Sequence, residues 1–427
     1  SPLSSRDDMA QLSDDCFAFG GPLMTVAAAW ELLSKRLKPV VASERVKLAR
    51  AHGRVLAEDL AARADIPPHD NTAVDGYAVY FDDLKPDGET RLPVAQGRAA
   101  AGHPFVGTAR RGQAVRVFTG AVMPAGPDTV MMQEDCTIES GAVVIRPGIM
   151  RGANRRRAGE DVRKGAVALR RGRRLRPQDV GMAAALGRAA LKVYRPLRVA
   201  LFSTGDELRE PGRRLGAGAI YDSNRYTLTG LLGGLGCDVT DLGILKDRRE
   251  VVQSALKKAA RGHDLIVTSG GVSVGDEDHV RAAVEALGSL HVWRLAIKPG
   301  RPAALGQVGR VPFLGLPGNP VAVMVTFYGL ARALVQLLSG AAPEPPRRFK
   351  VRAGFEHKKK AERREFLRAR LERAADGALV AHRFPRDGAG ILSSMVESDG
   401  LVELPEDLTR LAAGSMVDFL PFSEVAR

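Results

Sequence analysis

The stretch LRVALFSTGDEL, residues 197–208, decides the fold of the central part of this chain. The run LRVALFST (197–204) is short, continuous and apolar, which is typical of a buried strand. Gly205, Asp206 and Glu207 follow it directly. In doubly wound α/β proteins, ligands bind at such loops, beyond the carboxyl ends of the strands. The stretch therefore predicts a strand that ends at a binding site.

The residues that follow alternate between strand and helix patterns. We expect helices over SNRYTLTGLLGGLG (223–236), over EVVQSALKKAA (250–260) and near Asp278–Leu287. The expected strands are CDVTDLGIL (237–245), DLIVTSGG (264–271), HVWRLAIKPG (291–300) and VPFLGLPG (311–318). Alternation of this kind predicts a doubly wound parallel sheet with helices on both faces.

The segments before this region differ from it. Residues 23–63 carry helical periodicity, with apolar residues three and four positions apart. Residues 65–145 are short apolar runs broken by Pro and Gly, which predicts a small β-rich domain. Residues 146–195 are rich in Arg and Gly and become helical at Asp179–Leu186. We expect 146–195 to pack with 23–63, with the β region inserted between them.

The C-terminal part returns to short strand-like segments after the proline-rich stretch SGAAPEPP (339–346). These segments are FLRARLE (366–372), ALVAHRF (378–384), GLVELP (400–405) and SMVDFLPF (415–422). They predict a second, separate β domain.

The composition is that of an ordinary globular protein. Of 427 residues, 45% are apolar and 26% are charged, which disfavours disordered and fibrous proteins. Lys and Arg number 63 against 49 Asp and Glu, and the net charge of +14 favours anionic partners. Charge alone does not distinguish nucleic acid, lipid and phosphorylated small molecules. The chain has two Trp, six Tyr and no aromatic-basic motif, so nucleic-acid binding is disfavoured.

Neither a disulfide framework nor a membrane span is expected. Cys16, Cys136 and Cys237 lie too far apart for a CxxC clamp or a thiolate zinc site. Polar residues interrupt the apolar stretch Val321–Leu338, which we interpret as a buried helix. The first residues, SPLSSRDD, lack the apolar core of a signal peptide. We therefore expect a soluble, cytoplasmic protein that does not bind membranes.

Four Gly- or Pro-rich loops should converge on one edge of the sheet and form a binding site. Gly270 and Gly271 would let the backbone approach a phosphate closely; the alternative is a plain glycine turn before a helix. Neither GxGxxG nor GxxxxGK[ST] occurs, so a dinucleotide site and a P-loop are both disfavoured. The four loops are STGDE (203–207), SGGVSVGDED (269–278), KPGRP (298–302) and LPGNP (316–320).

Carboxylates gather on the same predicted edge. Because like charges repel one another, carboxylates beside a phosphate need a reason, and Mg²⁺ or acid–base chemistry supplies one. The alternative is helix capping, by Asp206 and Asp278 in particular. The members of the group are Asp206, Glu207, Asp247, Asp276, Glu277 and Asp278. The candidates for holding Mg²⁺ are Asp206, Glu207, Asp247 and Asp278.

Three cations stand close together in a neighbouring loop. Arg294, Lys298 and Arg301 surround a rigid turn formed by Pro299 and Gly300. Cations on a rigid turn suit the binding of a tetrahedral oxyanion. The alternative is a solvated basic loop without a ligand.

Taken together, these motifs resemble the MoeA family of molybdopterin molybdenumtransferases, to which the E domain of gephyrin is related. The similarity spans nearly the whole chain, whereas the MogA-type adenylyltransferases share only the α/β domain. Its motifs are DIPPHDNTAVDGYAV (65–79), VFTGAVMPAGPDTVMMQED (117–135), GANRRRAGEDVRKG (152–165), STGDEL (203–208), IYDSNRYTL (220–228), SGGVSVGDEDHV (269–280), LAIKPGRP (295–302) and LPGNPVAVMVTF (316–327).

The resemblance implies a multidomain α/β plus β protein that forms a homodimer. In the dimer, Asp75 and Thr119 of one subunit would face the α/β site of the other and complete the active site. The implied domains are an elongated helical-linker domain (1–64 with 146–195), an inserted β domain (65–145), a central MogA-like α/β domain (196–345) and a C-terminal barrel-like β domain (346–427).

The resemblance also implies the reaction. Molybdenum from molybdate would be inserted into adenylylated molybdopterin, and the adenylate would be cleaved with Mg²⁺ to release AMP, during molybdenum cofactor biosynthesis. A MogA-type adenylyltransferase and acceptor molybdoenzymes are the other partners that it implies. The rival hypothesis is a scaffold that keeps the fold and binds partner peptides at the dimer; the retained acidic and basic loops favour an enzyme.

The family positions assign roles to residues of this chain. Glu207, Asp161 and Asp278 match acidic positions implicated in activity, and Asp247 matches less well. Lys298, Pro299 and Arg368 match positions associated with molybdate. With the loop residues, the expected substrate-binding set is Asp75, Thr119, Gly270, Gly271, Arg294, Lys298, Pro299, Arg301, Pro317, Pro320 and Arg368.

The chain also departs from the family pattern. Arg294 and Arg301 stand where Lys is common, and a planar fork replaces a point charge there. Ala389 stands where related proteins often carry Ser, which removes a hydroxyl from the expected molybdate shell. His69 replaces a residue that is commonly aromatic.

Overall fold

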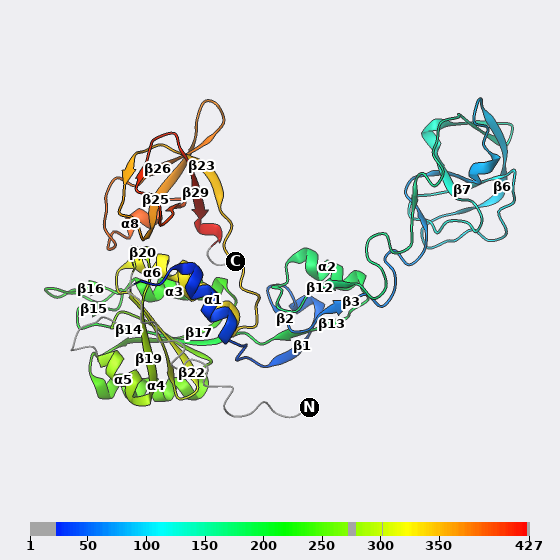
Figure 1. Ribbon diagram of the computed structural model, residues 1–427. Coiled ribbons are helices and arrows are strands. Elements are labelled where there is room, and N and C mark those ends of the chain that lie inside the picture. The colour runs from blue at the N-terminus through cyan, green and yellow to red at the C-terminus, as the bar shows by residue number, and fades with distance from the viewer. Residues whose placement is uncertain (1–22, 272–278, 301, 425–427) are drawn as a thin grey trace.

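The computed structural model of the protein describes residues 23–271, 279–300 and 302–424. The molecule is elongated (Figure 1). A small β unit lies at one end, an α/β unit and a second β unit lie at the other, and a narrow linker unit joins the two ends. The loops that the sequence analysis singled out therefore lie at both ends of the elongated molecule, in the inserted β unit and in the α/β unit.

The α/β unit contains the doubly wound sheet that the sequence predicts. The strands lie in the order β17-β14-β18-β22-β21-β19. Four adjacent strands run parallel to one another, namely β17 (Asp238–Leu245), β14 (Arg198–Thr204), β18 (Leu265–Ser269) and β22 (Val311–Leu316). The helices α3 (Asn224–Gly234), α4 (Arg249–Gly262) and α5 (His279–Leu287) connect the strands.

The expectation of a wholly parallel sheet is wrong at one edge. β21 (Pro302–Val308) runs antiparallel both to β22 and to β19 (Gly288–Arg294). Its sequence, PAALGQV, consists mostly of small residues and lacks the β-branched and aromatic residues that mark a strand. The short turn between β21 and β22 makes a hairpin, and this reversal places the turn before β21 at the carboxyl ends of the parallel strands.

Both faces of the sheet are covered by apolar clusters. Ala200 and Phe202 of β14 pack with α4 and α5 on one face, and Val199 and Leu201 pack with α3 and the long C-terminal helix on the other. That helix runs from α6 (Pro320–Thr326) through a π-helical turn into α7 (Arg332–Leu338). By length and composition Pro320–Leu338 is apolar enough to cross a membrane, but 89% of its apolar stretch is buried, as predicted for a core helix.

The helical pattern of residues 23–63 ends much earlier than expected. Helix α1 (Val26–Arg36) is followed by extended backbone at Leu37, and Pro39 prevents the helix from resuming, because it disfavours helix at Lys38 and has no N–H to donate. The rest of the linker unit is mainly β structure with one further helix, α2 (Pro177–Ala185). Its strands are β1 (Ser43–Lys47), β2 (Val55–Leu56), β3 (Leu60–Ala61), β12 (Val167–Leu169) and β13 (Ala190–Tyr194).

The inserted β unit is built around one six-stranded sheet in the order β8-β5-β7-β6-β10-β9. A two-stranded pairing of β4 (Asn71–Thr72) with β11 (Arg155–Arg156) lies between this sheet and the linker unit. The strands of the sheet are β5 (Gly76–Val79), β6 (Thr90–Ala99), β7 (Ala114–Val117), β8 (Thr129–Met132), β9 (Cys136–Glu139) and β10 (Ala142–Ile145).

The C-terminal unit is a closed five-stranded barrel. Its strands are β23 (Phe349–Ala353), β25 (Arg364–Arg373), β26 (Leu379–Arg383), β27 (Gly400–Leu404) and β29 (Met416–Pro421), and pairing of β25 with β27 closes it. A strand of the α/β unit, β20 (Ile297–Lys298), pairs in parallel with β25. The barrel is therefore joined to the α/β unit by backbone pairing as well as by side chains.

Candidate functional site

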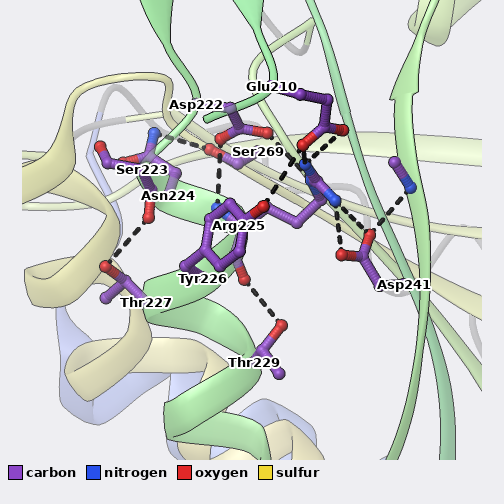
Figure 2. Close-up of polar contacts among 11 residues, drawn as sticks. Glu210, Asp222, Ser223, Asn224, Arg225, Tyr226, Thr227, Thr229, Asp241 and Ser269 are labelled. Carbon is purple, nitrogen blue, oxygen red and sulfur yellow. Dashed lines mark hydrogen bonds and ion pairs between the residues drawn. The ribbon is translucent and has the colours of Figure 1, made fainter. Parts of the chain in front are cut away.

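The loops that follow β14, β18 and β22 meet at one edge of the sheet. Asn224, the first residue of α3, holds two of them together, because its Nδ2 donates to Ser269 Oγ at 2.9 Å and to the carbonyl of Gly318 at 2.6 Å. Ser269 Oγ in turn donates to the carbonyl of Pro317 at 3.2 Å. Figure 2 shows Asn224 directed toward Ser269. The rigid 316–320 loop is thus fixed against the 269–271 loop.

The two glycines of the 269–271 loop are required by close packing. Gly270 and Gly271 have φ of 86° and 64°, a region that favours glycine. The N–H of Gly270 donates to the carbonyl of Leu316 at 3.0 Å. A Cβ on Gly271 would lie 2.6 Å from Val280 Cγ2 and 2.7 Å from Thr204 Cγ2. The loop after Gly271 continues into residues 272–278, outside the described part of the chain.

Replacement of Gly271 by Ala should destabilise the protein. The left-handed backbone costs a non-glycine residue about 1–2 kcal/mol, and overpacking adds about 1–3 kcal/mol. Gly218→Ala is the matched control, because Gly218 has a φ of 74° and open space around it. Urea unfolding should show a larger loss of unfolding free energy for Gly271→Ala than for Gly218→Ala. Equal losses would mean that the loop moves aside at no cost.

Arg225 organises the neighbouring edge of the sheet (Figure 2). Its buried guanidinium bonds to Asp222 at 3.0 Å, to Asp241 at 2.6 Å and to Glu210 at 2.6 Å. Burial by itself lowers the pKa of Arg225, but the hydrogen bonds to the three carboxylates raise it above its ordinary value. The network ties the segment after β14 to β17 and to the start of α3. It therefore fixes the acidic loop that contains Glu207.

Two of the predicted metal-binding carboxylates share one cavity. Asp206 and Asp247 line a depression of about 660 Å³, together with Gly205 and several basic residues. The basic lining residues are Arg209, Arg213, Lys246 and Arg248. Glu207 is exposed, and its carboxylate lies against Gly205, since a Cβ there would be 2.5 Å from Glu207 Oε2. The acidic loop and the end of β17 thus form one mixed-charge pocket beside the glycine loops.

The basic turn lies between the α/β unit and the barrel. Lys298 pairs with Glu365 of β25, with Nζ 3.1 Å from Oε1. Pro299 continues the turn, and Gly300 packs on the long helix, where a Cβ would lie 2.6 Å from Thr326 Oγ1. Arg294 is exposed at the end of β19. Arg301 and Asp278, two other predicted site residues, lie outside the described residues.

Arg368 reaches the same region from the barrel. It is buried, with Nε 3.0 Å from Ser394 Oγ and one terminal nitrogen 3.2 Å from the carbonyl of Gly388. The next carbonyl, that of Ala389, accepts from the N–H of Val321 at 2.9 Å, one residue after Pro320 begins α6. The segment at Ala389 therefore contacts the start of the long helix. The position at which this chain has Ala instead of the common Ser thus lies where the barrel meets the α/β unit.

Lys298 is linked to the segment around Asp387 by a chain of hydrogen bonds. The carbonyls of Arg386 and Gly388, on either side of Asp387, accept from Arg368. The pKa of Asp387 is lowered first by a hydrogen bond from Arg383 and further by the charges of Arg383, Arg368 and Lys298. Both predicted oxyanion ligands are therefore tied to the segment around Asp387.

Asp75 and Thr119 lie together in the inserted β unit, at the opposite end of the molecule (Figure 1). Asp75 Oδ1 accepts from Thr119 N at 2.7 Å and from Thr119 Oγ1 at 2.6 Å, and these bonds hold the pKa of Asp75 below its ordinary value. Asp161 is exposed in the linker unit, where its N–H donates to the carbonyl of Ile66 at 3.0 Å. Within one chain these three residues do not meet the α/β site.

Several residues of the site were not predicted from the sequence. Asn224, Arg225 and Glu365 carry its main cross-links. The buried hydroxyls of Ser203 and Thr204, at the end of β14, have no hydrogen-bond partner among the described residues. The motif IYDSNRYTL (220–228) contains Asn224 and Arg225 and is the sequence signal that points to them.

Comparison with known families covers almost all of the described chain. The family profile for the MoeA N-terminal region (domain I and II) matches residues 24–187. The profile for a probable molybdopterin binding domain matches residues 200–336, and the profile for the MoeA C-terminal region (domain IV) matches residues 350–422.

Whole-length relatives agree with these profiles. A molybdopterin molybdenumtransferase of Haemophilus influenzae is 38% identical, over 94% of this chain and 100% of that protein. One from a Nostoc species is 35% identical over 88% of each chain. Among solved structures, the molybdopterin biosynthesis moeA protein from Pyrococcus horikoshii matches with a TM-score of 0.77 and 30% identity, covering 94% of this chain and 100% of that one.

Proposed function

The chain belongs to the MoeA family, and from this premise we propose that it is a molybdopterin molybdenumtransferase of molybdenum cofactor biosynthesis. In the proposed reaction, molybdenum from molybdate enters the dithiolene of adenylylated molybdopterin. Water then adds across the bond between the two phosphates, which releases AMP. The observation that carries the proposal is that Asn224 holds the 269–271 and 316–320 loops together, at the same edge of the sheet as the mixed-charge pocket.

We assign different parts of the substrate to different loops, and the phosphate to the 269–271 loop. Within this loop we assign the phosphate to the backbone N–H of Gly271, because the N–H of Gly270 donates to the carbonyl of Leu316 and holds the loop in place. The buried hydroxyls of Ser203 and Thr204, which have no hydrogen-bond partner among the described residues, lie at the end of the neighbouring strand. Pro317 and Pro320 keep the loop beside them rigid.

The carboxylates of the mixed-charge pocket fit Mg²⁺ that arrives bound to the substrate phosphates. No group of three His, Cys, Asp or Glu able to hold a metal by itself occurs in the described ranges. Asp206 and Asp247, however, line one cavity, and Mg²⁺ is usually held by one or two carboxylates plus substrate phosphates and water. We therefore propose Asp206 and Asp247 as ligands, with Glu207 and Asp278 completing the site. The ion would neutralise charge on the phosphates when bound.

Glu207 would act on the attacking water. Its carboxylate is exposed beside Gly205, at the carboxyl end of β14, where it can accept a proton from water or orient it. Asp161 would support the same chemistry from the partner subunit. Asp75 and Thr119 would line the same wall from the partner subunit, because the inserted β unit that contains them lies at the opposite end of the molecule from the α/β unit (Figure 1). We therefore propose a homodimer with composite active sites.

The cations would receive the molybdate. Lys298 pairs with Glu365 of the barrel, and Pro299 shapes the turn that follows Lys298. Arg368 is buried in the barrel beside Ser394 and the carbonyl of Gly388. Arg294, which is exposed at the end of β19, and Arg301, which lies outside the described residues, would add positive charge to the oxyanion site. We further propose that the protein works in the cytoplasm, takes its substrate from a MogA-type adenylyltransferase and passes its product to acceptor molybdoenzymes.

A reconstituted assay tests the proposal. Purified protein, adenylylated molybdopterin, molybdate and Mg²⁺ should yield molybdenum cofactor and AMP in equal amounts. Binding of adenylylated molybdopterin without AMP release at any molybdate concentration would favour the scaffold hypothesis.

Replacement of Lys298 by Ala should weaken the use of molybdate more than the binding of the pterin. A charge-assisted hydrogen bond contributes about 1.5–3 kcal/mol, so half-maximal insertion should need roughly ten- to a hundredfold more molybdate. Lys350→Ala is the matched control, because Lys350 is a similarly exposed lysine, paired with Asp418 on the barrel. If Lys298→Ala abolishes pterin binding and leaves the molybdate dependence unchanged, the turn belongs to the phosphate site.

A further inference from the structure

Glu365 is a buried carboxylate whose two oxygens have different partners. Its side chain is 5% exposed, although it lies beside Lys298, which is 60% exposed. Oε1 is 3.1 Å from Lys298 Nζ, and Oε2 is 2.7 Å from His357 Nε2. His357 belongs to β24 (His357–Lys358), a short strand of the barrel unit. A buried charge of this kind is retained only when its partners satisfy it.

The contact of His357 with Arg383 determines which ring nitrogen of His357 carries the proton that faces Glu365. Arg383 lies 3.1 Å from His357 Nδ1. Because a guanidinium only donates, Nδ1 must accept, and the proton of a neutral His357 then sits on Nε2 and points at Glu365. Burial alone raises the pKa of Glu365, but the hydrogen bonds from His357 and Lys298 outweigh it and hold this pKa below its ordinary value. Glu365 is therefore held as an anion that faces Lys298.

The position of Lys298 depends on this anion. Lys298 and Glu365 are direct neighbours across the pairing of β20 with β25, so the barrel supplies the group that fixes a lysine of the α/β unit. An ammonium has three N–H donors; among the described residues Glu365 accepts one of them, and the others can face a ligand. Without an anchor, a lysine side chain has a flexible stem whose rotamers must be ordered when the ligand binds.

We propose that Glu365, fixed by His357, is the positioning residue that orients Lys298 for the oxyanion substrate. The inference rests on the proposed function, in which Lys298 binds molybdate. It adds a role for the barrel, which here orients a ligand-binding group of the neighbouring unit.

Replacement of Glu365 by Gln tests the inference. The amide has nearly the same size, but one of its two ends is a donor. It must therefore face either Lys298 or the Nε2–H of His357 with a donor opposite a donor, and the anchor is lost. The molybdate concentration for half-maximal insertion should rise about three- to tenfold, as for the loss of one hydrogen bond. The rate at saturating molybdate and the affinity for adenylylated molybdopterin should not change.

A matched control separates this role from general stability. Glu403 of β27 is also a buried carboxylate, with 4% side-chain exposure, and it pairs with Arg348 and Arg364. It lies opposite Phe366, one position along the same strand pair. Glu403→Gln should therefore disturb the barrel as much as Glu365→Gln does and leave the molybdate dependence at the wild-type value. An equal rise in both variants would overturn the proposal.

A double-mutant cycle distinguishes failure of the inference from failure of the proposed function. In the Lys298→Ala background, Glu365→Gln should cause no further rise, because Glu365 acts through Lys298. An additive rise, or no rise from Glu365→Gln in a chain where Lys298→Ala has its full effect, would overturn the positioning role. If Lys298→Ala itself leaves the molybdate dependence unchanged, the oxyanion assignment fails. Should Glu365→Gln fail to fold, His357→Gln replaces it in the same cycle, with the same expected direction.

Discussion

Glu207→Gln should slow adenylate cleavage by about a hundred- to ten-thousandfold, the range for loss of a general acid or base. The side chain is exposed at the carboxyl end of β14, against Gly205. The substitution keeps its size and removes its charge. The network of Arg225 with Glu210 and Asp241 supports the loop independently of Glu207, so the fold and the unfolding midpoint should be unchanged.

Release of AMP from bound adenylylated molybdopterin in a single turnover measures this effect. Glu250→Gln is the control, because Glu250 is an exposed carboxylate in the first turn of α4. The control should cleave at the wild-type rate at every Mg²⁺ concentration. A wild-type rate in Glu207→Gln would show that Glu207 takes no part in the cleavage. The mixed-charge pocket beside it would then have a role in binding alone.

Mixed dimers of two inactive chains should regain activity. An Asp75→Ala chain lacks the carboxylate that fixes Thr119, and a Glu207→Ala chain lacks the acidic group of the α/β site. Each homodimer should be inactive, because each of its sites lacks one group. A hybrid dimer has one site with both groups intact and one with neither, so it should turn over at about half the wild-type rate, as expected for one working site of two.

Two different affinity tags allow the hybrid to be purified and its composition checked before the assay. The elongated shape of the chain motivates the experiment, since the inserted β unit and the α/β unit lie at opposite ends (Figure 1). A verified hybrid without activity would show that Asp75 and Glu207 do not serve the same composite site.

Much of the α/β unit could be predicted because its signals are local. The apolar run before Gly205 became β14, and the loops after β14, β18 and β22 meet at one edge as expected. The helical pattern of 23–63 misled, because periodicity from Leu23 to Leu37 says nothing about the chain beyond Pro39. The antiparallel β21 was missed, because its small residues carry no strand signal.

The contacts that complete the site are non-local, and the sequence could not show them. Lys298 and Glu365 are 67 positions apart, and no motif links the basic turn to the barrel. Asn224 looks like an ordinary polar residue at a helix start, and its bond to Gly318 spans 94 positions. Such pairs follow from topology, so they become visible only when the strand order is known.

The pairing of β20 with β25 has a consequence for the modularity of this protein. The proline-rich stretch 339–346 looks like a boundary at which a domain could be exchanged or removed. The backbone pairing crosses that boundary, and it carries Lys298 to its anchor in the barrel. Recombination at 339–346 would therefore replace the barrel. It would also replace the residue that pairs with Lys298, although Lys298 itself lies before the boundary. The α/β unit and the barrel must therefore be exchanged together if Lys298 is to keep its partner Glu365.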